Sequence, residues 1–386
     1  MLRHNHHTII FAIFTQNYGV MVIENLALLF IRGLGSRGIV HLIDHFGSAE
    51  AIFRAPLNTL INDAKLRKDV AERIVAKEGM HEAEREIEYC RKNQIIAIAA
   101  TDDDYPEALR ETSDRPHVLF VKGNLKALHM RTLSMVGTRE ATPSGILAVD
   151  KIVGGLATQI SDLCIVSGLA YGIDSACHRS ALTHNATTVA VVADTLPNVN
   201  PAPNRNLADE ILRQGGALVS ELHSQSKQNG QLFIARNRII AALSMGTIIV
   251  ESPASGGSLA TADIADSYGR TVMAIPGRAT DTQSFGSNNL IRSGKARLIL
   301  TANDVIEDMG WDITQPVEEV CEASPIDSLT PNEQLIYKAF DTAATLDWTG
   351  IIAETGLTLG ELAMALMDME LKGVIRSLPG KRYERI

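Results

Sequence analysis

The sequence predicts a doubly wound α/β domain in the middle of the chain, between about residue 134 and residue 300. Short apolar runs rich in Val and Ile alternate there with helical segments, in the order LSMVG, LCIVSG, TVAVVAD, TIIVES and TVMAIPG. The runs are continuous rather than alternating, which is typical of parallel strands that crossover helices bury on both faces. We expect helices over residues 144–160, 174–184, 206–214, 233–244 and 258–268.

The flanking segments predict further domains, as expected for a chain of 386 residues. We expect residues 1–20 to be a disordered leader and residues 21–95 to be a helical domain, with one long charged helix over residues 70–93. The α/β domain then covers residues 96–312, and an acidic, Pro-bearing linker covers residues 313–327. Residues 328–386 read as three helices and a β-hairpin, the pattern of a winged helix.

The charge of the chain is unevenly distributed. The net charge is −9, which argues against a general nucleic-acid binder. Residues 131–300, however, carry 14 Lys and Arg against 12 Asp and Glu, a net of +2, whereas residues 301–386 carry 6 against 16, a net of −10. Any phosphate binding should therefore be local to the middle segment. Two alternatives remain for the last segment: its basic hairpin contacts DNA, or its acidic face contacts a protein.

Several kinds of site are not predicted. No apolar run reaches the ~18 residues of a membrane span, so we expect a cytoplasmic protein without membrane contact. The four cysteines show no C-x-x-C spacing, and we expect no metal site. The sequence has no G-x-x-x-x-G-K-[ST] loop, no Ser/His/Asp or Cys/His set and no clustered acidic pair of the kind that holds Mg²⁺ in nucleases, so we predict no catalytic residues and no cofactor.

The first strand of the α/β domain ends in a turn suited to anions. Gly137 lets the backbone approach a ligand, Thr138 offers a hydroxyl and Arg139 offers a bidentate guanidinium. Ligands of open α/β sheets bind at the carboxyl ends of the strands, next to free amides at helix N-termini. We therefore interpret this turn as a binding element; the alternative is a surface arginine beside a tight turn.

Two other strand ends carry similar turns. The second strand ends in Ser167 and Gly168, and Asp174 follows as a helix cap or, alternatively, as an acid/base group. After TIIVES, glycines and hydroxyls at a helix start form another phosphate cradle, made of Gly256, Gly257 and Ser258.

A fourth motif lies at the start of the helix predicted over residues 233–244. Arg236, Asn237 and Arg238 are side chains that contact phosphates and base edges, and Phe233 is suited to stack on an unpaired base. The alternative places Phe233 in the core and pairs one arginine with Glu221 or Glu251. Four such turns on one sheet edge are more specific than any one alone.

The motif Gly33-x-Gly35-x-x-Gly38 follows a helical pattern rather than a strand, so we reject a dinucleotide fingerprint. A plain helix–helix turn and a helix–hairpin–helix turn remain, and in the second the glycine amides and Arg37 would approach a phosphate.

Taken together, these motifs closely resemble the DprA/Smf family of DNA-processing proteins. The resemblance rests on MVGTREATPSG, VSGLAYGIDSACHRSAL, GALVSEL, FIARNRIIAALS, ESPASGGSLATADIADSYGR and FGSNNLIRSGKARLI, in this order. It implies an extended Rossmann-like domain that forms homodimers, an N-terminal domain of SAM or helix–hairpin–helix type, and a C-terminal winged helix. It also implies a non-enzymatic protein that binds single-stranded DNA and loads the RecA recombinase in natural transformation. The contacts that it implies are Gly137, Thr138, Arg139, Ser167, Gly168, Phe233, Arg236, Asn237 and Arg238.

A second hypothesis is an enzyme. The SGGS turn before a helix resembles a turn of nucleoside-monophosphate phosphoribohydrolases, which use a related Rossmann domain. Those enzymes need a carboxylate at the site, and Glu251 is the candidate here.

Overall fold

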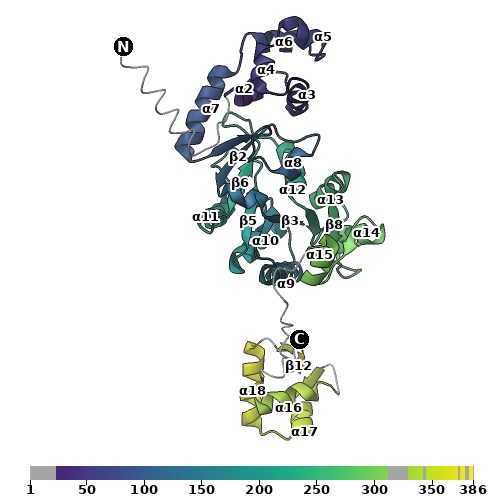
Figure 1. The fold of residues 1–386 in the computed structure, drawn as a ribbon. Coiled ribbons are helices and arrows are strands. Elements are labelled where there is room, and N and C mark those ends of the chain that lie inside the picture. Colours follow the sequence, from purple (N-terminus) through teal and green to yellow (C-terminus); the bar gives the residue numbers. More distant parts are fainter. Residues whose placement is uncertain (1–22, 312–328, 342–344, 373, 379–381, 386) are drawn as a thin grey trace. The chain divides into compact units, whose positions relative to one another are not determined.

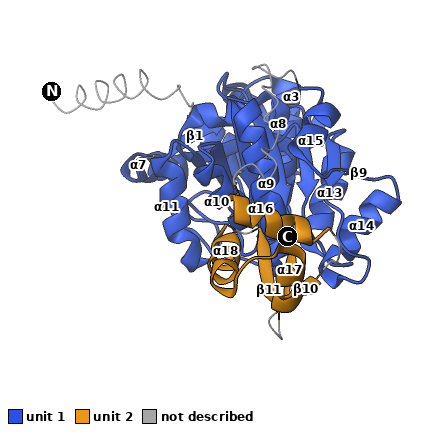
Figure 2. Ribbon diagram, turned by 90° about the horizontal axis from the view of Figure 1, so that it is seen from below, with its two compact units in different colours: residues 1–315 blue, residues 316–386 orange. Residues whose placement is uncertain are grey.

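The structure is a computed structural model that describes residues 23–311, 329–341, 345–372, 374–378 and 382–385 (Figure 1). The chain divides into two compact units, residues 1–315 and 316–386 (Figure 2). The expected leader and the expected linker lie outside the described residues. The boundary expected between residues 95 and 96 stays a prediction.

A nine-stranded sheet forms the centre of the first unit, in the order β1-β2-β6-β5-β4-β3-β7-β8-β9. The strands β6, β5, β4, β3, β7, β8 and β9 run parallel to one another in this order. β1 and β2 form an antiparallel edge beside β6. The predicted doubly wound, Rossmann-like sheet is confirmed. The strands are β1 (Ile96–Ala99), β2 (Val118–Gly123), β3 (Arg131–Val136), β4 (Leu163–Ser167), β5 (Thr187–Val191), β6 (Ala217–Ser220), β7 (Gly246–Ile249), β8 (Thr271–Ala274) and β9 (Arg297–Leu298).

The five predicted crossover helices are present, and each begins one or two residues before its predicted start. They are α9 (Pro143–Gln159), α10 (Ile173–Thr183), α11 (Arg205–Arg213), α12 (Gln231–Leu243) and α13 (Gly257–Ser267). The α/β domain also holds α8 (Glu107–Arg110), α14 (Phe285–Arg292) and α15 (Ala302–Met309). Helices cover both faces of the sheet, so strand residues alternate between two cores. In β3, Leu133 and Met135 pack with residues of α9 and α10, whereas Val136 packs with residues of α12 and α13.

The strand order reverses at β3, and this reversal positions the site. From β3 the chain builds outward through β4, β5 and β6, then crosses back to place β7 on the other side of β3. In open α/β sheets the ligand crevice lies at such a switch point, at the carboxyl ends of the strands. Here it lies between the turns that follow β3 and β7.

The helical segment before the sheet differs from the prediction at one point. The single long helix expected over residues 70–93 is wrong, because it is broken between α6 and α7 by Lys77 and Gly79, with φ angles of 56° and 88°. A Cβ at Gly79 would lie 3.1 Å from the Cβ of Phe30, so the glycine lets the chain pass close to α2. The helices are α2 (Ile23–Phe30), α3 (Ser36–Phe46), α4 (Ala49–Arg54), α5 (Leu57–Asn62), α6 (Lys68–Val75) and α7 (Met80–Asn93).

These N-terminal helices share a hydrophobic core with one side of the α/β domain, including Leu196 and Leu207. Polar contacts reinforce it. The Tyr89 hydroxyl donates to the Leu196 carbonyl at 2.8 Å, and the buried Glu86 carboxylate accepts the Ser224 amide at 2.8 Å. The helical segment is therefore held against the loops that follow β5 and β6.

The second unit contains the three helices and the hairpin expected for a winged helix, together with a third strand, β10, that was not predicted. Its elements are α16 (Pro331–Ala339), β10 (Thr345–Asp347), α17 (Trp348–Thr355), α18 (Leu359–Leu371), β11 (Ile375–Leu378) and β12 (Arg382–Arg385). Lys372, Arg376 and Arg385 pair with Glu333, Glu384 and Asp341, respectively. These pairs neutralise three of the basic residues that were expected to make the hairpin a DNA contact.

Within the described parts of the chain, no single helix has the length and apolar character of a membrane span. Only α17 and α18 taken together would pass on length and composition, and they are bent by 109°.

Candidate nucleic-acid interface

The turn after β3 is pinned on two sides by backbone contacts. The Thr138 amide donates to the Glu251 carbonyl at 2.8 Å, and the Thr138 carbonyl accepts the Ile173 amide at 3.1 Å. A Cβ at Gly137 would lie 2.7 Å from Cγ1 of Ile173, so only glycine fits between the ends of β7 and α10. The turn is thereby fixed, and it carries Arg139 on its exposed side.

Arg139 lies against the ring of Phe233. Its guanidinium carbon is 5.8 Å from the ring centroid, within the range of a cation–π contact. Among the described residues no acidic side chain forms a salt bridge with Arg139. The two motifs predicted at the ends of different strands therefore meet, and they offer a cation and an aromatic ring side by side.

Arg236, by contrast, points into the protein. It is 6% exposed and donates to the carbonyls of Gly168 and Val191, the first at 2.5 Å. A Cβ at Gly168 would lie 2.6 Å from this guanidinium, which explains the glycine. Burial lowers the pKa of Arg236, and the nearby Asp174 carboxylate opposes that shift. The role of Arg236 in the structure is to hold the turn after β4.

Asp174 is the buried counter-charge of Arg236. Burial raises its pKa, while Arg236 lowers it. Its carboxylate accepts the Ala170 amide at 3.4 Å, and the residue at the helix cap is Gly172, so the expected capping role is wrong. The chain enters α10 through Gly172, whose φ is 75°. Asp174 comes two residues later and therefore lies in the first helical turn.

The other members of these two motifs are also engaged within the protein. Ser167 is fully buried and donates to the Met135 carbonyl at 2.7 Å. Asn237 accepts from Nε of Arg236 at 3.2 Å. Arg238 forms an ion pair with Glu221, in which both side chains are mostly buried. The structure thus realises one part of the alternative weighed above, the pairing of one arginine with Glu221, whereas Phe233 is half-buried and lies outside the core clusters of the described residues.

The turn before α13 keeps an open face. Gly256 caps the helix without a side-chain hydrogen bond, and Gly257 is exposed, with nothing within 4 Å of a Cβ added there. Ser258 instead is buried and donates to Oγ of Ser252 at 2.9 Å. The amides of this turn are therefore the part of the motif that a ligand can reach.

The Glu251 carboxylate joins the two sides of the switch point through hydrogen bonds. Its carboxylate accepts the Thr142 amide at 2.9 Å and the Thr142 hydroxyl at 2.5 Å, at the N-terminus of α9. A Cβ at Gly145 would collide with it. A carboxylate that is engaged by Thr142 in this way is not free to act on a substrate, which disfavours the enzyme hypothesis. The described residues contain no cluster of three or more His, Cys, Asp or Glu side chains that would hold a metal ion.

Two residues of this edge were missed from the sequence. Asn204 is buried and donates to the Leu169 carbonyl at 2.8 Å, which stabilises Leu169 at a φ of 56°. Tyr171 is 48% exposed on the same turn and adds an aromatic side chain to the edge. An exposed aromatic residue between two glycines was the available signal for Tyr171, whereas nothing in the sequence indicated the contact of Asn204.

Comparison with known proteins identifies the family of this chain. The model of the family described as DNA recombination-mediator protein A matches residues 96–310. The chain belongs to the DprA/Smf family of DNA-processing proteins. The DprA winged helix domain matches residues 321–381.

Relatives and solved structures agree with this assignment. Protein Smf of Escherichia coli is 35% identical over 288 residues, which cover 73% of this chain and 75% of that protein. DNA processing protein DprA of Streptococcus pneumoniae is 40% identical over 212 residues, or 55% of this chain and 73% of that protein. The crystal structure of the S. pneumoniae protein matches with a TM-score of 0.66 and 31% identity, over 74% of this chain and 98% of that chain.

A second solved structure is informative about ligands. DNA processing protein A of Helicobacter pylori matches with a TM-score of 0.51 and 28% identity, over 57% of this chain and 97% of that chain. That structure is described as giving insight into a unique single-stranded DNA binding mode of the H. pylori protein.

Proposed function

We propose that this chain binds single-stranded DNA along the carboxyl edge of the parallel sheet and acts by binding, without catalysis. The observation that carries the proposal is the contact of exposed Arg139 with Phe233. A guanidinium neutralises a backbone phosphate, and an aromatic ring stacks on an unpaired base, so the pair matches the two parts of a nucleotide. The amides of Gly137, Gly256 and Gly257 and the ring of Tyr171 add further contacts on this edge. The description of the H. pylori relative supports the same ligand.

We further propose that the bound strand is handed to RecA. This is tested with single-stranded DNA that is first coated by a single-strand-binding protein, with ATP hydrolysis by RecA as the readout. We expect the chain to shorten the lag before hydrolysis begins. An unchanged lag at a concentration that saturates the DNA would contradict recombinase loading while leaving DNA binding intact.

We propose that two copies of the chain pair at the β9 edge of the sheet. Among the described strands, β9 is bonded only to β8, and the apolar side chains Leu298 and Leu300 are 48% and 66% exposed there. An edge strand with exposed leucines is a ready surface for a second copy. We expect Leu300→Glu to convert a dimer into a monomer in light scattering at micromolar concentration. Leu147→Glu, at an exposed position of α9, is the matched control, and a dimer that survives Leu300→Glu would exclude this edge.

A further inference from the structure

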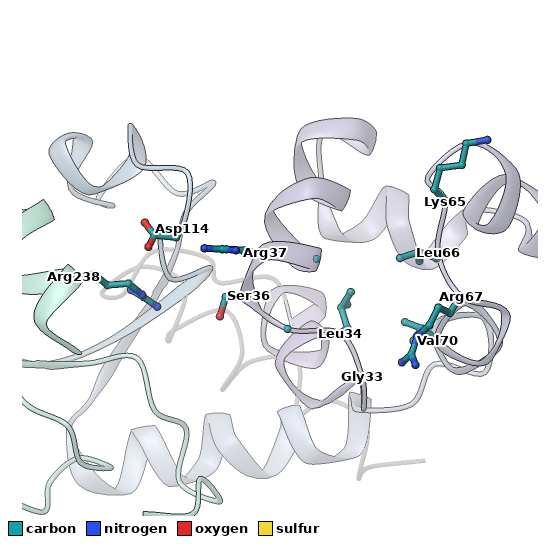
Figure 3. A pocket seen from close by; sticks show the side chains of 12 residues that line it. Gly33, Leu34, Ser36, Arg37, Lys65, Leu66, Arg67, Val70, Asp114 and Arg238 are labelled. Atoms are coloured by element: carbon teal, nitrogen blue, oxygen red, sulfur yellow. The ribbon is translucent and has the colours of Figure 1, made fainter. Parts of the chain in front are cut away.

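A cationic hollow lies beside the glycine turn near the N-terminus, and neither Arg139 nor Phe233 is among its lining residues. It has a volume of about 610 Å³ and lies between the Gly33–Gly38 turn, the segment over residues 65–70, and two residues of the α/β domain, Asp114 and Arg238 (Figure 3). Its basic lining residues are Arg37, Lys65, Arg67 and Arg238, against the single acidic residue Asp114. We refer to it below as the N-terminal hollow.

The hollow forms where residues pack closely at the Gly33–Gly38 turn. Gly33 has a φ of 89°, and a Cβ there would lie 2.7 Å from Nη2 of Arg67, so the guanidinium rests directly on the turn. α3 then begins after Gly35, which provides no side-chain cap, and its first residues line the same hollow. In Figure 3, Arg37 points toward Asp114, while Lys65 and Arg67 come from the opposite wall.

The positive charges of the hollow are incompletely neutralised. Within the part of the chain that the structure describes, neither Arg37 nor Lys65 forms a salt bridge. Arg67 has only the exposed Asp69 at 3.6 Å, a pair that contributes little. Arg238 is paired with Glu221, yet its Nη1 is buried without a hydrogen-bond partner among the described residues. The hollow therefore offers several unsatisfied donors to an anion with several acceptor oxygens.

A second hollow connects this place with the start of α12. It has a volume of about 370 Å³, shares Arg37, Asp114 and Arg238 with the first, and is lined by Ile234, the residue that follows Phe233. Ile234 is 64% exposed, so an apolar side chain borders the path from Phe233 to Arg37. This continuity favours a chain of phosphates over an isolated anion.

We propose that the N-terminal hollow is a second phosphodiester site, which receives the backbone of the DNA strand after that strand leaves Phe233. The proposal rests on the single-strand binding proposed above. It gives the Gly33-x-Gly35-x-x-Gly38 motif the phosphate-binding role that its spacing alone did not establish. The net charge of the N-terminal segment is near zero, and the proposal gives this segment a local part in DNA binding.

The test compares two double variants with two lengths of oligo-dT. Arg37→Glu/Arg67→Glu reverses two exposed charges of the hollow, and Arg85→Glu/Arg91→Glu reverses two exposed charges of α7, outside the lining of the hollow. The oligonucleotides are about 6 and about 25 nucleotides long; the first is near the lower end of the roughly 4–16 nucleotides of a single-strand site, and the second is longer than such a site. Dissociation constants are measured at several salt concentrations, and thermal unfolding checks that each variant is folded.

We expect Arg37→Glu/Arg67→Glu to weaken the long oligonucleotide at least about tenfold and to reduce its salt slope by about 1.4, since each lost phosphate contact removes about 0.7. The short oligonucleotide should bind as it does to the parent chain. Equal effects of the two double variants on the long oligonucleotide would overturn the proposal. A loss confined to blunt duplex DNA would also overturn it, because a duplex would then be the ligand. Arg139→Ala with the short oligonucleotide tests the primary site alone, so failure of that site is separately visible.

Discussion

Arg139→Ala is expected to weaken the binding of oligo-dT by about 30-fold, which corresponds to about 2 kcal/mol. Arg139 is exposed, so its removal should leave the fold intact, and its cation lies against Phe233 rather than against an acidic side chain. The variant should lose one phosphate contact, and the slope of affinity against salt should fall by about 0.7. Fluorescence anisotropy at several salt concentrations measures both quantities.

The matched control for Arg139→Ala is Arg213→Ala. It also removes one positive charge, but Arg213 lies at the end of α11 and pairs with Glu210. Because α11 runs antiparallel to the strands, this end lies away from their carboxyl edge. Arg139→Lys keeps the charge but loses the planar fork, and we expect an intermediate affinity. An Arg139→Ala variant that is folded and binds with unchanged affinity would remove Arg139 from the proposed site.

Arg236→Ala is expected to have the largest effect on stability, a loss of about 3–5 kcal/mol in the free energy of unfolding. The substitution leaves the Asp174 carboxylate buried without its counter-charge and frees the carbonyls of Gly168 and Val191. Urea unfolding at neutral pH measures the loss. Arg179→Ala, at an exposed position of α10, should stay within about 0.5 kcal/mol of the parent chain. An Arg236→Ala variant as stable as the parent chain, but unable to bind DNA, would instead make Arg236 a direct DNA contact.

The loss caused by Arg236→Ala should depend on pH. Burial raises the pKa of Asp174 above its unfolded value, and removal of Arg236 raises it further. The protonated form is then favoured in the folded state, so stability is retained below the unfolded pKa and lost as the pH rises through the folded pKa. His178 adds to the same difference between variant and parent. Burial and then Arg236 lower its pKa to about 3, which costs stability as the pH falls below the unfolded pKa, and removal of Arg236 relieves part of that cost. The difference between variant and parent should be smaller at about pH 5 than at about pH 8.

The fold was largely predictable because its signals are local and repeated. Continuous Val-rich and Ile-rich runs mark strands that are buried on both faces, and five crossover helices begin within one or two residues of their predicted starts. The broken helix at Gly79 was missed because the apolar stripe continues on both sides of it. The close packing of this glycine against Ala27 and Phe30 of α2, which the sequence does not show, accompanies the break.

The site was predictable in position but not in detail. Sequence order places Arg139 and Phe233 at the same sheet edge, and the structure brings them together. The sequence alone does not show which way the side chain of an arginine near a helix start will point. Arg236 turns inward because Gly168 leaves room for it and Asp174 balances its charge. Arg236 lies 68 residues after Gly168 along the chain, so its contacts with Gly168 and Asp174 follow from the topology of the sheet rather than from any local pattern.

The most direct test of the central claim is photo-crosslinking of the full chain to oligo-dT, followed by mapping of the crosslinked peptides. A single strand held on the carboxyl edge predicts crosslinks in the turn that carries Arg139 and at the start of α12, around Phe233. These crosslinks should disappear when unlabelled oligo-dT is added in excess. Crosslinks confined to the unit over residues 316–386, with none at these two turns, would contradict the account.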